Sequence, residues 1–569
     1  MDRVYSGQRI RPAANDARKG TQVKNTNTHH WPLYVAIAIF LMIVTAILGV
    51  SLSMNQGRLV YTLDDPYIGM AMARNLAHYG VWGATRYAFT SCSSPPFWTL
   101  RLSLTSYVSG EHQLTPLLWD LFFTLADLIA AYAIMDWYKV AALTRFATLL
   151  ALILLIPLPA QVMTGMEPPV QILVSMLAVF LAARWLSGES AATVRGDSMG
   201  LLGLAPVITG VRFEGMFLII AIGMLLMALR RWICALAFCV LGFLPVLIYG
   251  LISVAKGWFW LPNSVLLKAT LPASTSPGGF VLSLCYAIMT NTRMALHVPA
   301  LLLAVLLVYL AASGKGSGRK ESRQLMGTII LLVGIAHMEF VRPTLLYRYD
   351  AYLSALAMLF VAVQLPVIIP VWPRLLSLET WGVPKHAAAG ALALALFFPV
   401  AMEGGVLLWQ VPQCTHNIFD QQYQMASFVR TYYQGSSLAL NDIGAVNYYA
   451  DIHCLDLWGL ATMPVAKAKR GHRYDRALVA SLSRQAQVRI AIVYDAWFEG
   501  MLPPDWVRVG AWTITNNMVA ANDTVSFYAA SPAEAPHLME CLREYSAQLP
   551  GDVIQRGPYL SWGSGRVVP

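Results

Sequence analysis

The sequence predicts a mostly α-helical, polytopic membrane protein with about eleven transmembrane helices and a C-terminal extracytoplasmic α/β domain. Of the 569 residues, 57% are hydrophobic and only 12% are charged, and the mean hydropathy is +0.55. Such values are typical of multi-spanning proteins rather than of soluble enzymes with one core. Long apolar runs also recur through the first three quarters of the chain and then stop after residue 411.

The chain divides into three regions in this interpretation. Residues 1–30 are polar and basic and precede an apolar run that has no small-residue cleavage site, which favours a disordered cytoplasmic tail and an uncleaved first span. Residues 31–411 form the transmembrane domain, and residues 412–569 form the outer domain. The predicted spans are 32–53, 114–136, 145–162, 169–187, 198–211, 213–229, 232–254, 295–313, 325–341, 349–371 and 387–411.

Three further segments mix aromatic, polar and basic residues, as interfacial or re-entrant helices do: 67–80, 97–110 and 279–293. If the first span starts in the cytoplasm, nearly every basic cluster falls on the inner side, as the positive-inside tendency requires. The cluster at 315–323 is the densest of them. An odd number of spans then places the C-terminal domain outside, in the periplasm of a bacterial inner membrane.

Five polar signals converge on the outer face in this topology. They are Asp64 with Asp65, Glu167, Arg212 with Glu214, Asn263 with Lys268, and a segment with Arg342, Arg348 and Asp350. Each of these five signals, taken alone, is explained equally well as an ordinary charged residue in a loop. Several of them lie at span ends, where ionisable groups tend to mark a functional site.

Carboxylates and basic residues at one membrane face suit a transfer reaction. A carboxylate can take the proton of an attacking hydroxyl, and Arg or Lys can hold a phosphate leaving group. The sequence has no P-loop, dinucleotide-binding turn, nucleophile elbow, HExxH or paired CxxC motif. An activated substrate must therefore arrive in the membrane, which a lipid-phosphate-linked sugar does. The net charge of +10 reflects inner loops, and no motif indicates nucleic-acid binding.

An ordered series of motifs resembles the GT-C membrane glycosyltransferases, and more narrowly the mycobacterial-type terminal arabinofuranosyltransferases and their bacterial relatives. The acidic pair Asp64-Asp65 is followed by the stretch ARNL at 73–76 and by a segment with Ser94 and Trp98. The turns TGME at 164–167 and RFE at 212–214, and a PNS loop at 262–264 with Lys268, come next. Phe213 departs from the pattern, in which proline is usual, and so does Cys92 beside SSPP.

The resemblance implies a sugar transfer, with inversion, from a polyprenyl-phosphate donor to a hydroxyl acceptor, the sugar being a pentose such as arabinofuranose. Asp64 becomes the general base, and Asp65 orients the acceptor, shapes the local field or helps to hold a metal. The candidates for the donor phosphate are, in order, Lys268, Arg212 and Arg348. The candidates for substrate contact are Glu167, Glu214, Asn263 and Trp98. The two glutamates read equally well as partners of nearby basic residues, and Asn263 as a helix cap.

No cofactor is required by these motifs, although an acidic pair can hold Mg²⁺ or Mn²⁺ against phosphate oxygens. The acceptor stays open among a glycan, a lipid headgroup and a protein. Two other classes of protein are alternatives. A transporter would show internal repeats and charged span centres, which this sequence lacks. A non-catalytic scaffold for envelope assembly would need the outer domain but not the acidic pair.

Strand-like and helix-like pieces alternate in the outer domain, which predicts a small α/β fold. Asp442, Asp456 and Asp495 follow apolar strands, where they either contact a ligand or, more simply, cap turns. Trp458, Trp497 and Trp512 suit sugar stacking or an ordinary core. Among the cysteines on the outer side, Cys414 and Cys454 are the preferred disulfide pair.

Overall fold

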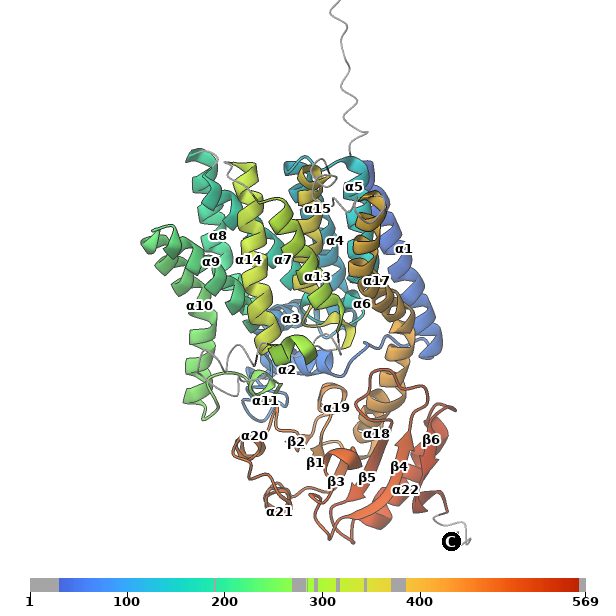
Figure 1. Ribbon diagram of the computed structural model, residues 1–569. Coiled ribbons are helices and arrows are strands. Elements are labelled where there is room, and N and C mark those ends of the chain that lie inside the picture. Colours follow the sequence, from blue (N-terminus) through green and yellow to red (C-terminus); the bar gives the residue numbers. More distant parts are fainter. Residues whose placement is uncertain are drawn as a thin grey trace, which may run out of the picture.

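The structure is a computed structural model in which a helical bundle sits above a smaller sheet-containing domain (Figure 1). Of the segment 279–293, predicted to be an interfacial helix, the structure describes residues 283 and 285–290, which are helical; Arg342 lies outside the described residues. The described residues are 30–188, 191–268, 283, 285–290, 295–313, 318–341, 345–369 and 385–561.

Helices occupy all eleven predicted apolar runs. Within the described residues, six helices are long and apolar enough, by length and composition, to cross a membrane: α1, α4, α7, α10, α15 and the segment Gly390–Tyr432 that begins within α17. The bundle consists of α1 (Trp31–Met54), α4 (Leu114–Trp137), α5 (Ala142–Leu155), α6 (Leu158–Val162), α7 (Pro168–Ser187), α8 (Ala191–Val211), α9 (Met216–Ala228), α10 (Trp232–Ala255), α13 (His297–Ala311), α14 (Arg319–Phe340), α15 (Ala351–Ile368) and α17 (Lys385–Ile418). The predicted multi-pass membrane fold is confirmed.

Burial distinguishes central from peripheral helices in this bundle. In their most apolar windows α7 is 72% buried and α15 is 78% buried, whereas α1 is 28% buried. A helix that is apolar all round must be covered by protein or by lipid. The apolar side chains that α10 exposes, among them Ile233, Leu236 and Leu251, therefore face the lipid.

The helices α2 (Asp65–Tyr79) and α11 (Asn263–Lys268) lie between the bundle and the outer domain, and α3 (Pro96–Ser109) packs against α2 at the lower end of the bundle (Figure 1). Pro66 stands in the first turn of α2, where the missing N–H costs nothing. Gly80 ends the helix in the left-handed conformation, with φ of 66°, and donates its N–H to Leu76. The helices predicted at 67–80 and 97–110 are thus present.

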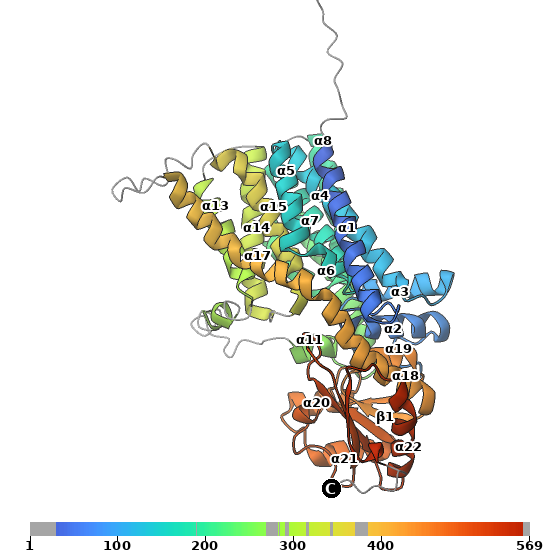
Figure 2. The same cartoon turned by 90° about the vertical axis from the view of Figure 1, so that its right-hand side faces the viewer.

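The last membrane helix runs into the outer domain without a loop (Figure 2). Residue 411 lies inside α17, which continues through a π-helical turn, η5 (Phe419–Tyr423), into α18 (Gln424–Tyr432). A continuous helix transmits position more rigidly than a flexible linker does.

The C-terminal domain, which keeps the name outer domain from the predicted topology, contains a six-stranded mixed sheet in the order β2-β1-β3-β5-β4-β6. Strand β1 (Ser437–Leu440) pairs in parallel with β2 (His453–Asp456) and β3 (Ile490–Val493). The strands β4 (Val507–Thr513), β5 (Thr524–Ala529) and β6 (Ile554–Arg556) pair antiparallel, and β5 joins β3. The helices α19 (Gly444–Tyr449), α20 (Met463–Arg470), α21 (Arg476–Gln485) and α22 (Ala535–Tyr545) complete the predicted α/β domain, which is confirmed.

The predicted Cys414–Cys454 disulfide is wrong. All seven cysteines are free thiols. Cys414 is buried within α17, whereas Cys454 lies on the edge strand β2 of the sheet. The two thiols therefore belong to different elements and do not form a bond. A disulfide forms only when its Cα atoms lie within about 7 Å, which the sequence cannot reveal.

Candidate active site

The acidic pair lies where the membrane bundle meets the parallel half of the sheet. Asp64 precedes α2, and its carboxylate accepts two backbone hydrogen bonds from the first turn of α19. Gly444 N donates to Oδ2 and Ala445 N donates to Oδ1, both at 2.7 Å. A Cβ atom at residue 444 would lie 2.0 Å from the carbonyl oxygen of Asp64, so this close approach requires glycine. The DIG turn at 442–444 is thus one docking point between the loop before α2 and the outer domain.

Asp64 has a strongly perturbed acidity. Burial raises the pKa of Asp64 to about 8, and repulsion from Asp442 adds to the rise, while the two backbone hydrogen bonds oppose it. Asp442 accepts hydrogen bonds from Tyr494 at 2.6 Å and from Gln422 at 2.8 Å. Burial raises the pKa of Asp442 as well. A carboxyl group that titrates near neutral pH is suited to general-base chemistry.

Asp65 is the first residue of α2 and forms an ion pair with Arg348. The Arg348 Nη2 group donates to the hydroxyl of Tyr349 at 3.0 Å. The Arg348 side chain keeps 12% of its surface exposed. A guanidinium has five donors, so Arg348 retains capacity for a further anion.

Arg212 is more completely paired. Its Nη1 donates to Glu167 at 2.7 Å, and its Nη2 and Nε donate to Glu214 at 2.7 and 3.1 Å. Its side chain is only 2% exposed and lies over the Tyr349 ring, 4.4 Å from the centroid. Two carboxylates neutralise the charge of Arg212, so its main role here is to hold Glu167 and Glu214.

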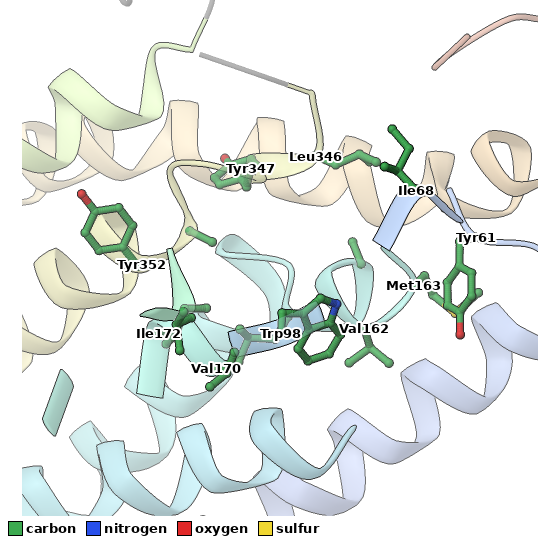
Figure 3. Close-up of a cluster of buried hydrophobic side chains, with 14 of the residues drawn as sticks. Tyr61, Ile68, Trp98, Val162, Met163, Val170, Ile172, Leu346, Tyr347 and Tyr352 are labelled. Carbon is green, nitrogen blue, oxygen red and sulfur yellow. The ribbon is translucent and has the colours of Figure 1, made fainter. Parts of the chain in front are cut away.

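A cavity of about 320 Å³ opens beside these groups. The side chains of Asp65, Glu167, Arg212, Glu214 and Arg348 form its polar end. Its walls are apolar and include Ile68, Trp98, Phe217, Leu261, Phe340 and Val341. Figure 3 shows Trp98 and Ile68 within a cluster of apolar side chains drawn from several elements. A charged end with apolar walls matches an anionic headgroup that carries a hydrocarbon chain.

A second cavity, of about 240 Å³, lies between the acidic pair and the outer domain. It is bordered by Asp64 and Asp442, and by Trp458 and Trp497, whose ring centroids are 4.6 Å apart. Asp65, Ile68 and Leu460 border both cavities. The acidic pair therefore stands between a membrane-side space and an outer-domain space.

The structure does not bring every predicted residue to the cavities. The Asn263 amide donates to the carbonyls of Gly459 and Leu460 at 2.8 and 3.2 Å, which ties the α11 loop to the outer domain. Lys268 ends α11, but its side chain lies outside the described part of the chain. Asp350 accepts a hydrogen bond from His337 at 2.8 Å and is buried away from both cavities.

Two other acidic residues that the sequence singled out, Asp456 and Asp495, have structural contacts. Asp456 accepts backbone N–H groups of Trp458, Gly459 and Ala461 at 2.7 to 3.1 Å and so caps a turn. Asp495 accepts hydrogen bonds from two side chains of β5, Ser526 at 2.8 Å and Tyr528 at 2.9 Å. The turn cap expected as the simpler interpretation fits Asp456, whereas Asp495 joins its loop to β5 through side-chain hydrogen bonds.

Sequence reasoning missed two features. Asp120 and Asp127 are buried inside α4, so the membrane spans are less bare of charge than the apolar runs indicated. The contact between Asp64 and the turn at 442–444 joins residues 380 positions apart, and no local sequence pattern predicts it. In the described residues, neither Asp64 nor Asp65 belongs to a group of three side chains close enough to share a metal ion.

Comparisons with known proteins address the fold. Residues 416–528 match a domain of unknown function, DUF8728. No curated protein matches the chain. ArnT from Cupriavidus metallidurans bound to undecaprenyl phosphate superposes with a TM-score of 0.51 at 13% identity, over 88% of this chain and 98% of that one.

Two other solved structures match more distantly. The oligosaccharyltransferase of Archaeoglobus fulgidus gives a TM-score of 0.46 at 12% identity, over 91% of this chain and 76% of that one. The arabinofuranosyltransferase AftD from Mycobacteria gives 0.41 at 13% identity, over 88% of this chain and 41% of that one. The predicted likeness to GT-C glycosyltransferases is confirmed at the level of the fold: a polytopic membrane bundle with a C-terminal sheet domain.

Proposed function

We propose that this protein transfers a sugar from a polyprenyl-phosphate carrier to a hydroxyl acceptor at the outer face of a bacterial inner membrane. The observation that supports it best is the position of Asp64 and Asp65 between two cavities of different character. One cavity has apolar walls and a charged end, and the other has two tryptophans and lies against the outer domain. Such an arrangement lets a lipid-borne donor and an external acceptor meet at one carboxylate pair.

The donor occupies the membrane-side cavity in this proposal. Arg348 is the first phosphate ligand, ahead of Arg212, because Glu167 and Glu214 already neutralise Arg212. Lys268, at the end of α11, is the second basic ligand. The polyprenyl chain lies along Trp98, Phe217 and the other apolar walls. The ArnT structure bound to undecaprenyl phosphate, whose fold this chain shares, supports a carrier of that class.

The acceptor enters through the outer-domain cavity, where Trp458 and Trp497 offer aromatic faces to a sugar ring. Asp64 takes the proton of the acceptor hydroxyl as its oxygen bonds to the anomeric carbon, while the bond from that carbon to the phosphate oxygen breaks. Both electrons of that bond leave with the polyprenyl phosphate, whose charge Arg348 stabilises. A single displacement inverts the anomeric configuration. The motif series favours a pentose such as arabinofuranose as the sugar.

Asp64 remains able to act despite its two backbone hydrogen bonds. Each carboxylate oxygen has a second lone pair, and the backbone donors fix the carboxylate in place. Asp65 orients Arg348 and completes the border between the cavities. If the acidic pair faces the outer side of the membrane, the N-terminal tail is cytoplasmic and the domain at 412–569 is periplasmic.

The test is sugar transfer by the purified full chain reconstituted in lipid, with a panel of synthetic polyprenyl-phosphate sugars and of hydroxyl acceptors. We expect Asp64→Asn to lose turnover while it still binds polyprenyl phosphate. Asp505→Asn, an exposed carboxylate in an outer-domain loop, is the matched control. Equal turnover in wild type, Asp64→Asn and Asp65→Asn would exclude the acidic-pair mechanism. Carrier binding without transfer across the whole panel would favour a transporter or a scaffold.

A further inference from the structure

A cluster of metal-ligating side chains lies at the junction of the last membrane helix and the outer domain. His416 comes from the end of α17, Asp420 from the π-helical turn η5, and Asp552 from the loop before β6. One ligand atom of each lies within 4.8 Å of the others. The His416 Nε2 atom is 3.3 Å from Asp420 Oδ2 and 2.8 Å from Asp552 Oδ2.

The neighbours of His416 orient its ring toward the two carboxylates. The amide nitrogen of Asn55, just after α1, donates to the hydroxyl of Thr415 at 3.1 Å. The Asn55 oxygen therefore faces His416 Nδ1, 3.2 Å away, and accepts its N–H. A hydrogen bond at one ring nitrogen fixes the tautomer that leaves the other nitrogen free to bind a metal.

The surroundings of Asp420 support a bound cation independently of the distances between the three side chains. Its side chain is 1% exposed, and its Oδ1 atom has no hydrogen-bond partner in the part of the chain that the structure describes. A buried carboxylate oxygen without a hydrogen-bond donor is costly, and two ionised carboxylates beside one imidazole leave excess negative charge even if the ring is protonated. A divalent cation neutralises both carboxylates with a neutral histidine. Asp420 also lies in a π-helical turn, a feature often found at functional sites.

We infer that His416, Asp420 and Asp552 form a binding site for a divalent transition metal, Zn²⁺ or Mn²⁺. Imidazole with two carboxylates suits these ions better than Mg²⁺ or Ca²⁺, which favour oxygen-only ligands. Ligand atoms around a tetrahedral ion at about 2.0–2.1 Å are roughly 3.3 Å apart, close to the distance between His416 and Asp420. Asp552 is 42% exposed on a loop and can make the small adjustment that the site needs.

The site has a structural consequence that is independent of sugar transfer. It joins the last membrane helix to the loop before β6, at the antiparallel end of the sheet. The acidic pair docks onto the opposite, parallel half, through Gly444. A metal there would hold the outer domain at a further point and stabilise the folded chain.

The experiment is metal analysis and thermal unfolding of the purified full chain in detergent. After treatment with EDTA, the protein is titrated with Zn²⁺, Mn²⁺, Mg²⁺ and Ca²⁺. We expect about one Zn²⁺ or Mn²⁺ per chain and a rise in the unfolding temperature. We also expect at least tenfold weaker binding in Asp552→Asn, whose exposed loop position makes it tolerant of the change, and in Asp420→Asn. Asp505→Asn is the matched control and should bind as wild type does.

Two results would overturn the inference. One is the absence of bound metal in wild type across the four ions, which would make the cluster an ion pair between a protonated histidine and the carboxylates. The other is equal metal content and equal stabilisation in wild type and Asp552→Asn. Neither result depends on sugar transfer, so a failure here is distinct from a failure of the proposed function.

Discussion

At the scale of single residues, partners rather than residue types decide which basic groups remain available to a ligand. Arg212 and Arg348 lie at the same cavity, yet two glutamates enclose Arg212, whereas Arg348 has one carboxylate partner and partial exposure. The sequence ranked them in the opposite order because it cannot show pairing across loops. Arg348 is therefore the residue to change first.

We expect Arg348→Ala to reduce turnover on the order of 10²-fold, the usual effect of losing one donor to developing negative charge. Arg348→Lys should recover only part of this loss, because an ammonium cannot make the same forked contacts. The measurement is turnover together with affinity for polyprenyl phosphate. The double variant Asp65→Asn/Arg348→Ala controls for the loss of the ion pair between Asp65 and Arg348. Normal carrier binding and turnover in Arg348→Ala would contradict the assignment.

The acidity of Asp64 leads to a pH prediction. Because burial and Asp442 raise the pKa of Asp64 to about 8, the active carboxylate forms only as the pH approaches and passes that value. Turnover should therefore increase with pH through about 8. Asp442→Asn removes the neighbouring negative charge and should move the inflection to lower pH. An unchanged pH profile of turnover in Asp442→Asn would show that Asp442 does not raise the pKa of Asp64.

The raised pKa of Asp64 also makes the folded state less stable as the pH rises. The folded state holds the proton of Asp64 more tightly than the unfolded state does, since the pKa of Asp64 is raised from 3.8 to about 8. This group therefore disfavours folding increasingly as the pH rises from about 4 to about 8. Thermal unfolding of wild type and Asp64→Asn across that range checks it. We expect the stability of wild type to fall more steeply with pH than that of Asp64→Asn.

At the scale of elements, the turn after β1 fixes the outer domain to the loop before α2. Arg74 on α2 supports the same contact by donating to the carbonyls of Asn447 and Tyr448 in α19, at 3.0 and 2.5 Å. This contact requires a residue without a side chain at position 444. Backbone shape therefore determines the position of Asp64 as much as its own chemistry does.

Gly444→Ala should accordingly disrupt both stability and turnover. The added Cβ atom would meet Asp64 at 2.0 Å and must displace the turn, at a cost of about 1–3 kcal/mol. Thermal unfolding and sugar transfer are the measurements. Gly551→Ala is the matched control, because a Cβ atom at residue 551 has no atom within 4 Å. Equal effects of the two substitutions would show that the close approach is unimportant.

Sequence patterns predicted the elements well because hydropathy and capping are local. The apolar runs became α1 to α17, and the aromatic and basic stretches at 67–80 and 97–110 became α2 and α3. The acidic pair and the DIG turn were both visible, but their contact spans 380 residues and depends on packing. For the same reason the pairing of Arg212 with Glu167 and the separation of Cys414 from Cys454 could not be predicted from spacing.

At the scale of the whole molecule, neither domain contains a complete site. The membrane bundle provides Asp65, Arg348 and the apolar walls, whereas the outer domain provides Asp442, Trp458 and Trp497. Leu460 of the outer domain reaches both cavities. Under the proposed function, the bundle would bind the lipid-borne donor and the outer domain would select the acceptor.

This division predicts that Trp497→Ala weakens acceptor binding without changing donor binding. Losing one aromatic face of the pair should raise the acceptor KM about tenfold, equivalent to about 1.4 kcal/mol, with kcat and carrier affinity nearly unchanged. The measurement is acceptor-dependent kinetics beside a direct polyprenyl-phosphate binding assay. Trp409→Ala is the matched control, because Trp409 is 87% exposed on α17 and borders neither cavity. A loss of carrier binding in Trp497→Ala, with acceptor KM unchanged, would reverse the roles assigned to the two cavities.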